Sequence, residues 1–371
     1  MTPHPIDVRY GIVGAGMMGV EHIHNINHLP GAVVTAIADP HPPSQAAAVA
    51  AAEHDVTVFD DHRHLLESGR CDAVVVATPN MTHVDVLGDV LGTDHHVLVE
   101  KPLCTTVADC QQVIGQAATH DGVVWVGLEY RYMPPVRQLI DEVHAGAVGA
   151  VRMVSVREHR FPFLVKVNDW NRFSHNTGGT LVEKCCHFFD LMNLIVGVRP
   201  VQVYASGGQD VNHLDEIYDG RRSDILDNAF VIVDYPGGVR ALLDLCMFAE
   251  ATLHHEELSV VGDTGKVEAV LPQSEFRRGR RGEHWMGQVE VEPVSDPTVL
   301  FEGFHHGSSF LEHQGFLDAI RTGTEPAVTL DDGLWSVAVG AAAHRSIDEG
   351  RPVTLAEMID QPGTRTGTTS G

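Results

Sequence analysis

Residues 183–192 gather several side chains that carry enzyme chemistry into one short stretch, EKCCHFFDLM. The two cysteines and His187 could bind a metal, or one cysteine could act as a nucleophile. Alternatively, Glu183 and His187 could form an acid–base pair. The spacing of these residues, and the elements that carry them, have to distinguish the three chemistries.

The segment 180–194 is predicted to be a helix. Glu183 and His187 are four residues apart, and Asp190 follows three residues later, so all three would share one side of it. Asp190 is then either a partner of His187 or an exposed carboxylate. Lys184 is one step off that side and is expected in solvent.

The two cysteines fit neither a metal site nor thiol catalysis. Adjacent residues of a helix point about 100° apart, and structural zinc sites take spaced pairs of ligands in fours. The sequence has no second pair of cysteines, and His187 faces away from Cys186. We therefore expect Cys185 and Cys186 to be buried free thiols, and we expect no metal.

A dinucleotide-binding turn is predicted near the N-terminus. Residues 8–26 read as an apolar strand, a glycine turn and a helix, with the G-x-G-x-x-G spacing in Gly14-Ala15-Gly16-Met17-Met18-Gly19. The first glycine permits the tight turn, the second lets a pyrophosphate approach the backbone, and the third lets the helix pack on the strand.

The residue that should select the cofactor is Asp39, which ends a second apolar run, 32–39. A carboxylate at this place hydrogen-bonds the ribose hydroxyls of NAD and repels the 2′-phosphate of NADP. NAD is therefore the expected cofactor, and NADP is the less favoured one.

Short apolar runs continue to alternate with helical stretches through the first third of the chain, at 56–59, 72–78, 96–100 and 123–127. Continuous apolar strands between helices predict a parallel, doubly wound sheet. Ligands bind beyond the carboxyl ends of such strands. The residues there are Thr78-Pro79-Asn80 and Glu100-Lys101-Pro102.

The composition excludes several classes of protein. Fifty acidic and 25 basic residues give a formal charge of −25, which repels nucleic acids and anionic membranes. Six cysteines form no evenly spaced framework, and no apolar run approaches the length of a membrane span. We expect a cytoplasmic protein that binds a small molecule.

Six motifs together resemble the glucose–fructose oxidoreductase, inositol dehydrogenase and rhizopine catabolism (Gfo/Idh/MocA) family of NAD(P)-dependent oxidoreductases. They occur in family order across nearly the whole chain: GIVGAGMMG, ATPNMTH (77–83), VLVEKPL (97–103), GLEYRYMP (127–134), GGTLVEKCCHFFDLM (178–192) and RPVTL (351–355).

The resemblance implies a fold of two domains. An N-terminal Rossmann domain with a doubly wound parallel sheet would occupy 1–130. A substrate-binding and oligomerisation domain of α/β type, with a large, mostly antiparallel sheet, would occupy 131–360. Strand-like runs after residue 150 and two amphipathic stretches, 308–321 and 331–349, agree with this layout. The polar tail 361–371 is expected to be disordered, and a homodimer or homotetramer is expected.

The resemblance also implies roles for single residues. Lys101, Glu183 and His187 would be catalytic, and the bond before Pro102 is commonly cis. Glu183 stands where the family has aspartate, and Cys185 where glycine is common. The cofactor would contact Gly14, Gly16, Met17, Met18, Gly19, Asp39, Thr78, Pro79, Asn80, His83, Glu100 and Lys101. Substrate would contact Glu129, Arg131, His159, Trp170, Arg172, Glu183 and His187.

The expected reaction is reversible oxidation of a secondary hydroxyl of a cyclitol, sugar or sugar derivative, as in inositol 2-dehydrogenases. His187, with an ordinary pKa of about 6.5, would accept the hydroxyl proton. Lys101 would stabilise the developing alkoxide. Two alternatives remain: an NAD-dependent glycosidase that oxidises a sugar transiently and eliminates the aglycone, and a non-catalytic protein that senses nucleotides.

Overall fold

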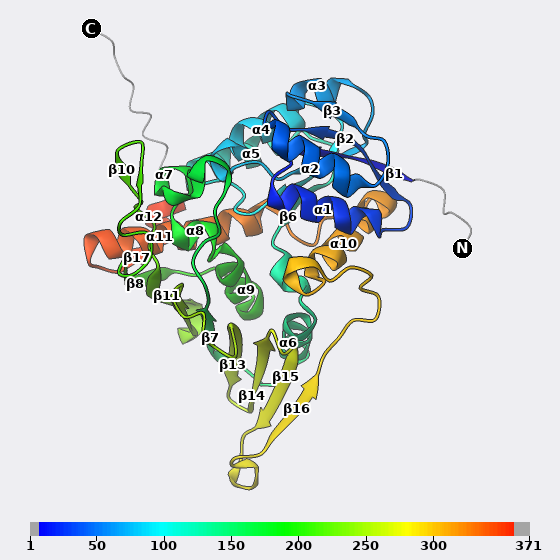
Figure 1. Ribbon diagram of the computed structural model, residues 1–371. Coiled ribbons are helices and arrows are strands. Elements are labelled where there is room, and N and C mark those ends of the chain that lie inside the picture. Colours follow the sequence, from blue (N-terminus) through cyan, green and yellow to red (C-terminus); the bar gives the residue numbers. More distant parts are fainter. Residues whose placement is uncertain (1–6, 360–371) are drawn as a thin grey trace.

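The computed structural model describes residues 7–359, which form two sheets with helices around and between them (Figure 1). The predicted tail 361–371 lies outside the described residues. Within the described chain, no helix is long and apolar enough to cross a membrane.

The first sheet has six strands in the order β3-β2-β1-β4-β5-β6, and every pairing in it is parallel. Its strands are β1 (Val8–Val13), β2 (Ala32–Ala38), β3 (Thr57–Phe59), β4 (Ala73–Val76), β5 (His96–Glu100) and β6 (Val124–Gly127). The connecting helices are α1 (Met17–Asn27), α2 (Pro42–Ala52), α3 (His62–Glu67), α4 (His83–Leu91) and α5 (Val107–Ala117). The predicted doubly wound fold is confirmed, because each apolar run became a strand of this sheet.

The second sheet has nine strands in the order β16-β15-β14-β13-β7-β12-β11-β8-β17. All of its pairings are antiparallel except that of β7 with β12. The strands are β7 (Val151–His159), β8 (Gln202–Gly208), β11 (Asn228–Asp234), β12 (Arg240–Cys246), β13 (Glu256–Gly262), β14 (Gly265–Leu271), β15 (Glu275–Arg280), β16 (Val289–Pro293) and β17 (Val353–Thr354). Two further strands, β9 (Ile217–Tyr218) and β10 (Arg221–Arg222), form a separate small hairpin.

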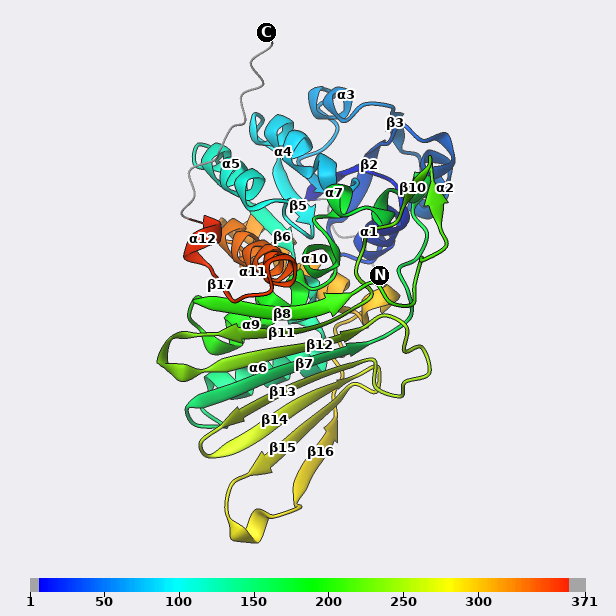
Figure 2. The same ribbon diagram turned by 90° about the vertical axis from the view of Figure 1, so that its left-hand side faces the viewer.

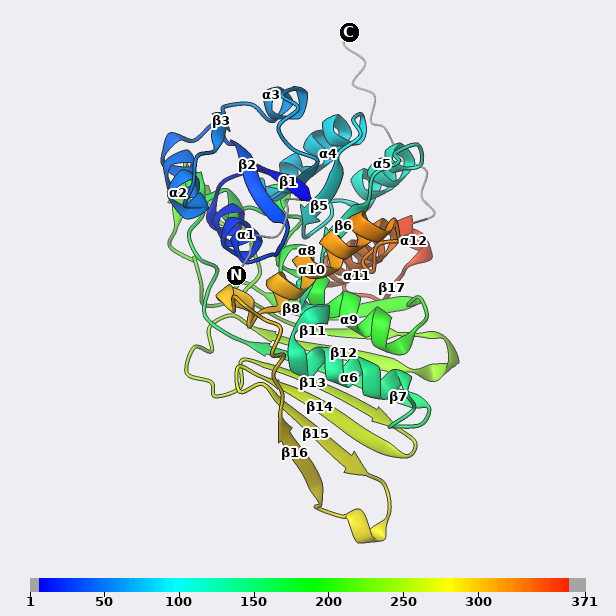
Figure 3. The same cartoon turned by 90° about the vertical axis from the view of Figure 1, so that its right-hand side faces the viewer.

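Helices cover one face of the large sheet and leave the other open, as Figures 2 and 3 show from opposite sides. The covering helices are α6 (Pro134–His144), α9 (Cys186–Val196) and α11 (Leu330–Glu349). Alternation along β7 follows this arrangement, since Val154, Val156 and Glu158 are buried while the residues between them are partly exposed.

Two long helices lie near the C-terminus, and one of them, α11, contacts β6 of the first sheet and β8 of the second. α10 (Ser308–Thr322) packs against α1, and α11 packs against both α5 and α9. These helices confirm the amphipathic stretches predicted at 308–321 and 331–349. Because they touch both parts of the molecule, the domain limits 1–130 and 131–360 stay a prediction. A short helix, α12 (Ala356–Ile359), ends the described chain.

The helix predicted over 180–194 is wrong in one respect, because it is broken in the middle. α8 (Thr180–Glu183) follows a first short helix, α7 (Ser174–Thr177), and α9 begins only at Cys186. At the break, the Glu183 carbonyl accepts a hydrogen bond of 3.1 Å from Lys101 Nζ. In a continuous helix this carbonyl would accept from the backbone of His187 instead.

Candidate active site

The glycine turn between β1 and α1 has the geometry of a phosphate-binding cradle. Gly14 has a φ of +90°, and a Cβ there would lie 2.6 Å from the backbone of Ala77. A Cβ on Gly19 would collide with the carbonyl of Gly14, whereas a Cβ on Gly16 would meet no atom within 4 Å. The three glycines therefore match the prediction from their spacing. Gly14 forms the tight turn, Gly19 allows the helix to pack closely, and Gly16 leaves space for a pyrophosphate.

Asp39, just after β2, is fixed beside this turn. Its Oδ2 accepts the backbone N–H of Ala15 at 2.7 Å, and its Oδ1 accepts the N–H of His41 at 2.7 Å. Each oxygen has a second lone pair, so the carboxylate can still accept ribose hydroxyls. The cradle and this carboxylate fit an adenine dinucleotide.

The next strand end contributes η1 (Asn80–Thr82), with Thr78 and Pro79 before it. His83 was expected at the cofactor, but its side chain is fully buried. Its ring nitrogens lie 2.9 Å from the Pro102 carbonyl and 3.1 Å from that of Thr78. His83 therefore braces the two loops that follow β4 and β5 and presents no polar atom to a ligand.

Glu100 and Lys101 follow β5, and the peptide bond from Lys101 to Pro102 is cis, as expected. Glu100 Oε1 lies 2.9 Å from His22 Nε2, and its Oε2 accepts the N–H of Lys101 at 3.1 Å. Burial works to raise the pKa of Glu100, but the hydrogen bond from His22 and nearby positive charges outweigh it and lower the pKa to about 2. A permanent carboxylate thus lies next to Lys101.

Burial by itself lowers the pKa of the Lys101 ammonium, but Cys186 and the surrounding carboxyl groups outweigh this effect and raise it. Lys101 is therefore a cation at neutral pH. Its Nζ is held by the Glu183 carbonyl, so it lies at the break between α8 and α9. This position suits a hydrogen-bond donor to an alkoxide rather than a proton acceptor.

His187 lies in the first turn of α9 and is almost completely buried. Its ring stacks on that of Tyr130, with centroids 4.0 Å apart and planes inclined by 9°. Burial first, and then the nearby cations Lys101 and Lys184, hold the pKa of His187 well below 6.5. The sequence-based expectation of an ordinary pKa is therefore wrong, but the shift keeps the imidazole in its base form at neutral pH.

Two buried carboxyl groups lie close enough to Lys101 to act on its pKa. Glu183 is 6% exposed, and burial raises its pKa to about 7 against the influence of Lys101, Lys166 and Arg172. Glu129, the first residue of η2 (Glu129–Tyr132), is 2% exposed, and burial raises its pKa to about 8. Its Oε1 lies 3.7 Å from His187 Nε2.

Both parts of this arrangement match family models in order along the chain. Residues 8–128 match the model described as "Oxidoreductase family, NAD-binding Rossmann fold", and residues 140–355 match "Oxidoreductase family, C-terminal alpha/beta domain". The chain belongs to the Gfo/Idh/MocA family of oxidoreductases. The family predicted from six short motifs is confirmed.

Relatives of full length share about a quarter of the residues. The myo-inositol 2-dehydrogenase of Thermotoga maritima is 26% identical over 95% of this chain and 100% of its own. The inositol 2-dehydrogenase of Rhizobium meliloti is 27% identical over 94% and 99%. A levoglucosan dehydrogenase solved with NADH and levoglucosan shares the fold, with a TM-score of 0.83 at 18% identity over 94% and 99%.

Within this family fold, Arg131 has a structural place rather than the expected one in the substrate site. Its guanidinium donates to both oxygens of Asp190 at 2.6 and 2.5 Å and to the Ala327 carbonyl at 2.9 Å. Asp190 is thus neither a partner of His187 nor exposed. The two residues form a buried ion pair that ties α9 to η2.

Lys184 was expected in solvent and is instead 5% exposed. Its Nζ lies 3.0 Å from Glu158 and donates to the Tyr130 hydroxyl at 2.7 Å. Because Tyr130 stacks on His187, this buried network also holds the His187 ring in place. Cys185 and Cys186 are buried free thiols, as predicted, and burial raises the pKa of both.

The remaining residues predicted to contact the substrate lie in different parts of the structure. His159 lies on the open face of the large sheet, opposite to Glu158, and pairs with Asp244 at 3.1 Å, so the structure does not bring it together with Lys101 and His187 and its substrate contact stays a prediction. Arg172 is 2% exposed in η3 (Val167–Arg172), bonds to Glu216 and Tyr218, and is close enough to lower the pKa of Glu183. Trp170 is half-buried in the same turn.

Four site residues were missed by sequence reasoning. His22 bonds to Glu100, Tyr130 stacks on His187, Lys166 acts on the pKa of Glu183, and His305 lies 3.6 Å from Glu129. Tyr130 is within a recognised motif, so its place could have been anticipated. His305 had no such signal.

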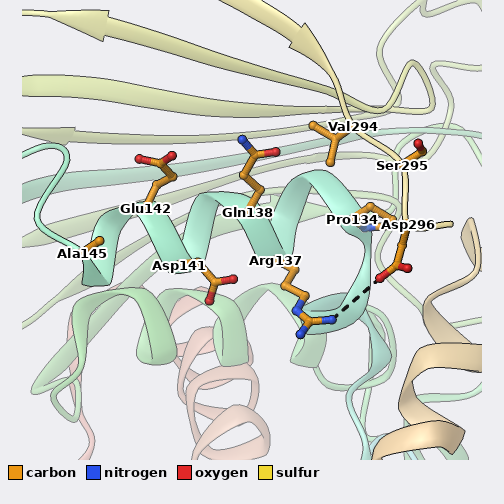
Figure 4. Close-up of a pocket in the computed structure, with 9 residues that line it drawn as sticks. All are labelled: Pro134, Arg137, Gln138, Asp141, Glu142, Ala145, Val294, Ser295 and Asp296. Carbon is orange, nitrogen blue, oxygen red and sulfur yellow. Dashed lines mark ion pairs between the residues drawn. The ribbon is translucent and has the colours of Figure 1, made fainter. Parts of the chain in front are cut away.

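A separate depression of about 550 Å³ lies between α6 and the segment after β16 (Figure 4). Arg137 and Asp296 form an ion pair of 3.9 Å across it. None of the candidate site residues lines this depression, so it is distinct from the candidate active site. Among residues 7–359, no group of three or more potential ligands is arranged to hold a metal ion.

Proposed function

We propose that this protein is an NAD-dependent dehydrogenase that oxidises a secondary hydroxyl of a cyclitol, sugar or sugar derivative, similar to inositol 2-dehydrogenases. The observation that carries the proposal is the meeting of Lys101 with the α8–α9 break, which brings a cation, a carboxyl group and a neutral imidazole together. The relatives named for myo-inositol, inositol and levoglucosan support a cyclic polyol as substrate.

A nicotinamide dinucleotide held in the cradle would supply the acceptor for the hydride. His187 accepts the proton of the reacting hydroxyl, and Lys101 donates a hydrogen bond to the oxygen as negative charge develops. Glu183 accepts a hydrogen bond from a neighbouring hydroxyl, which orients the ring. The residues that would hold the dinucleotide are Gly14, Gly16, Met17, Met18, Gly19, Asp39, Thr78, Pro79, Asn80, Glu100 and Lys101.

The preference for NAD over NADP is assigned to Asp39. Its carboxylate is anchored by the backbone of Ala15 and His41, so it cannot swing away from a 2′-phosphate without losing two hydrogen bonds. Repulsion and desolvation would then disfavour NADP.

A panel of cyclitols, sugars and glycosides with NAD separates this proposal from its alternatives. Formation of NADH and a ketone from a free polyol supports the dehydrogenase. Release of an aglycone without net NADH would instead establish the redox glycosidase. Binding of NAD without turnover of any substrate would favour the sensing protein, although a sensor has no need of Lys101, Glu183 and His187 together.

The open face of the large sheet is proposed as the surface that forms a dimer or tetramer. Tyr204, Ile232 and Leu242 occupy facing positions on three adjacent strands and are 44%, 42% and 38% exposed. An apolar patch of this kind usually marks an interface. Light scattering after gel filtration would measure the mass, and a monomeric wild-type protein would contradict this assignment.

A further inference from the structure

Oxidation of an alcohol releases a proton as well as a hydride, and the base that takes the proton is almost sealed from water. The His187 side chain is only 2% exposed. Each turnover must return this imidazole to its base form, so the proton needs a route to solvent.

Two further titratable side chains continue outward from His187. Glu129 Oε1 lies 3.7 Å from His187 Nε2 and 3.6 Å from His305 Nδ1. The Glu129 side chain is 3% exposed, and that of His305 is 24% exposed. Exposure therefore rises along the row from base to carboxyl group to outer imidazole.

Separate contacts hold each member of the row in place. His187 stacks on Tyr130, and His305 ends the short turn η6 (Gly303–His305). The residue before it, Phe304, donates its backbone N–H to the Glu21 carboxylate at 3.0 Å. This contact anchors η6 to α1 and so fixes His305 beside Glu129.

We propose that Glu129 and His305 carry the proton from His187 to solvent, a role that rests on the proposed dehydrogenase function. The hydroxyl proton passes to His187 while the hydride leaves with the dinucleotide. Glu129, which is mostly protonated at neutral pH, gives its proton to Nδ1 of His305 and takes a replacement from His187 Nε2. His305 releases the proton on its other nitrogen to water, which leaves its ring in the opposite tautomer. Proton exchange with water restores the starting tautomer before the next turnover.

The chemistry of Glu129 suits a carrier rather than a structural anion. Within the described residues, neither of its carboxyl oxygens has a hydrogen-bond partner, whereas Asp190 is fixed by Arg131. The separations of 3.6 and 3.7 Å are about half an ångström longer than a hydrogen bond, so a small side-chain movement completes each transfer.

The surrounding charges make the transfer from Glu129 to His305 the uphill step of the relay. Burial raises the pKa of Glu129 to about 8, and burial with the nearby cations lowers that of His305 to about 3. A protonated His305 is therefore short-lived. The charged or titratable groups that act on the pKa values of these two side chains are Glu100, Lys101, Arg160 and Lys184, and Glu312 also lies close to Glu129.

The test compares hydride transfer with proton release in single turnovers, following NADH absorbance and a pH indicator in weak buffer. The two signals should coincide in the wild type. In His305→Gln, the rate of proton release should be about tenfold or more lower than the rate of NADH formation. Added imidazole should restore the rate of proton release. His284→Ala is the control, because it removes an exposed histidine at the β15–β16 turn and should keep the signals together.

A second readout needs no turnover. In cofactor-free protein labelled with ¹⁵N-histidine, titration of Glu129 should shift the resonances of both His187 and His305 at one pH, and Glu129→Gln should abolish this shared step. Coincident signals in His305→Gln, or no shared step in the wild type, would overturn the relay alone. Failure of the wild type to oxidise any polyol would remove the proposed function, and the relay with it.

Discussion

Lys101 Nζ donates a hydrogen bond of 3.1 Å to the backbone carbonyl of Glu183. The lysine follows β5 of the parallel sheet. The glutamate ends α8, just before α9, which packs on β7 of the large sheet, so this contact links the two parts of the molecule at the candidate site. The Glu183 carbonyl is therefore not available for the helical hydrogen bond from the backbone N–H of His187. The position of Lys101 Nζ is therefore tied to the break before α9.

Cofactor selection should change with Asp39. Wild-type protein should use NAD at least tenfold more efficiently than NADP, a difference of about 1.4 kcal/mol. Asp39→Ser should narrow this gap, because it removes the negative charge while leaving a hydroxyl for the ribose. Steady-state kcat/KM with both cofactors measures the ratio. Equal use of NADP by the wild type would contradict the assignment to Asp39.

The pH dependence of oxidation should follow carboxyl groups rather than His187. The pKa of His187 lies well below 6.5, so this base is already deprotonated at neutral pH. Glu183 has a pKa of about 7 and accepts hydrogen bonds best when ionised, so kcat/KM should rise as the pH increases through about 7. Glu183→Gln should remove that rise. A rise that persists unchanged in this variant would assign it to another group.

Ionisation of the buried Glu183 should also lower the free energy of unfolding at high pH. Its pKa is raised from 4.5 in the unfolded reference to about 7, so the penalty is absent below about pH 4.5 and complete above about pH 7. Glu183→Gln should therefore stabilise the fold by roughly 1–3 kcal/mol at about pH 8 and hardly at all at about pH 4. Denaturant unfolding at both pH values measures the change, and equal effects at both would show that ionisation is not the cause.

The ion pair of Arg131 and Asp190 should contribute to the stability of the fold and not to the catalytic rate. Arg131→Met leaves a buried carboxylate without its partner and should cost about 3–5 kcal/mol. Replacing both residues, with Arg131→Met and Asp190→Leu, should recover much of that loss. At temperatures where the variants remain folded, kcat should stay within a fewfold of wild type. A rise in the KM for the polyol in a well-folded Arg131→Met variant would instead show that Arg131 contacts the substrate.

The sequence was most informative where structure depends on local pattern. Continuous apolar runs predicted the six parallel strands, and the glycine spacing predicted the cradle at Gly14, Gly16 and Gly19. Motifs also brought Lys101, Glu183 and His187 together, although they lie on different elements. These predictions needed no knowledge of which distant side chains meet.

The sequence could not predict which residues distant along the chain pair with one another in the folded protein. Arg131 and Lys184 looked like ordinary charged residues, and only the packed fold shows that Asp190 and Glu158 neutralise them in the interior. His305 enters the site because η6 is anchored to α1 through Glu21, a contact between opposite ends of the chain. The pKa of His187 depends on the same burial and could not be judged from its residue type.

The most direct test of the central claim measures NADH formation from a turned-over polyol by Lys101→Ala and His187→Ala, with NAD binding followed separately by fluorescence. Each variant should lose roughly a hundredfold or more in kcat while binding NAD almost normally. The double variant should lose less than the product of the two effects, because both groups act on one transition state. Turnover within a fewfold of wild type in both well-folded single variants would contradict the proposed mechanism.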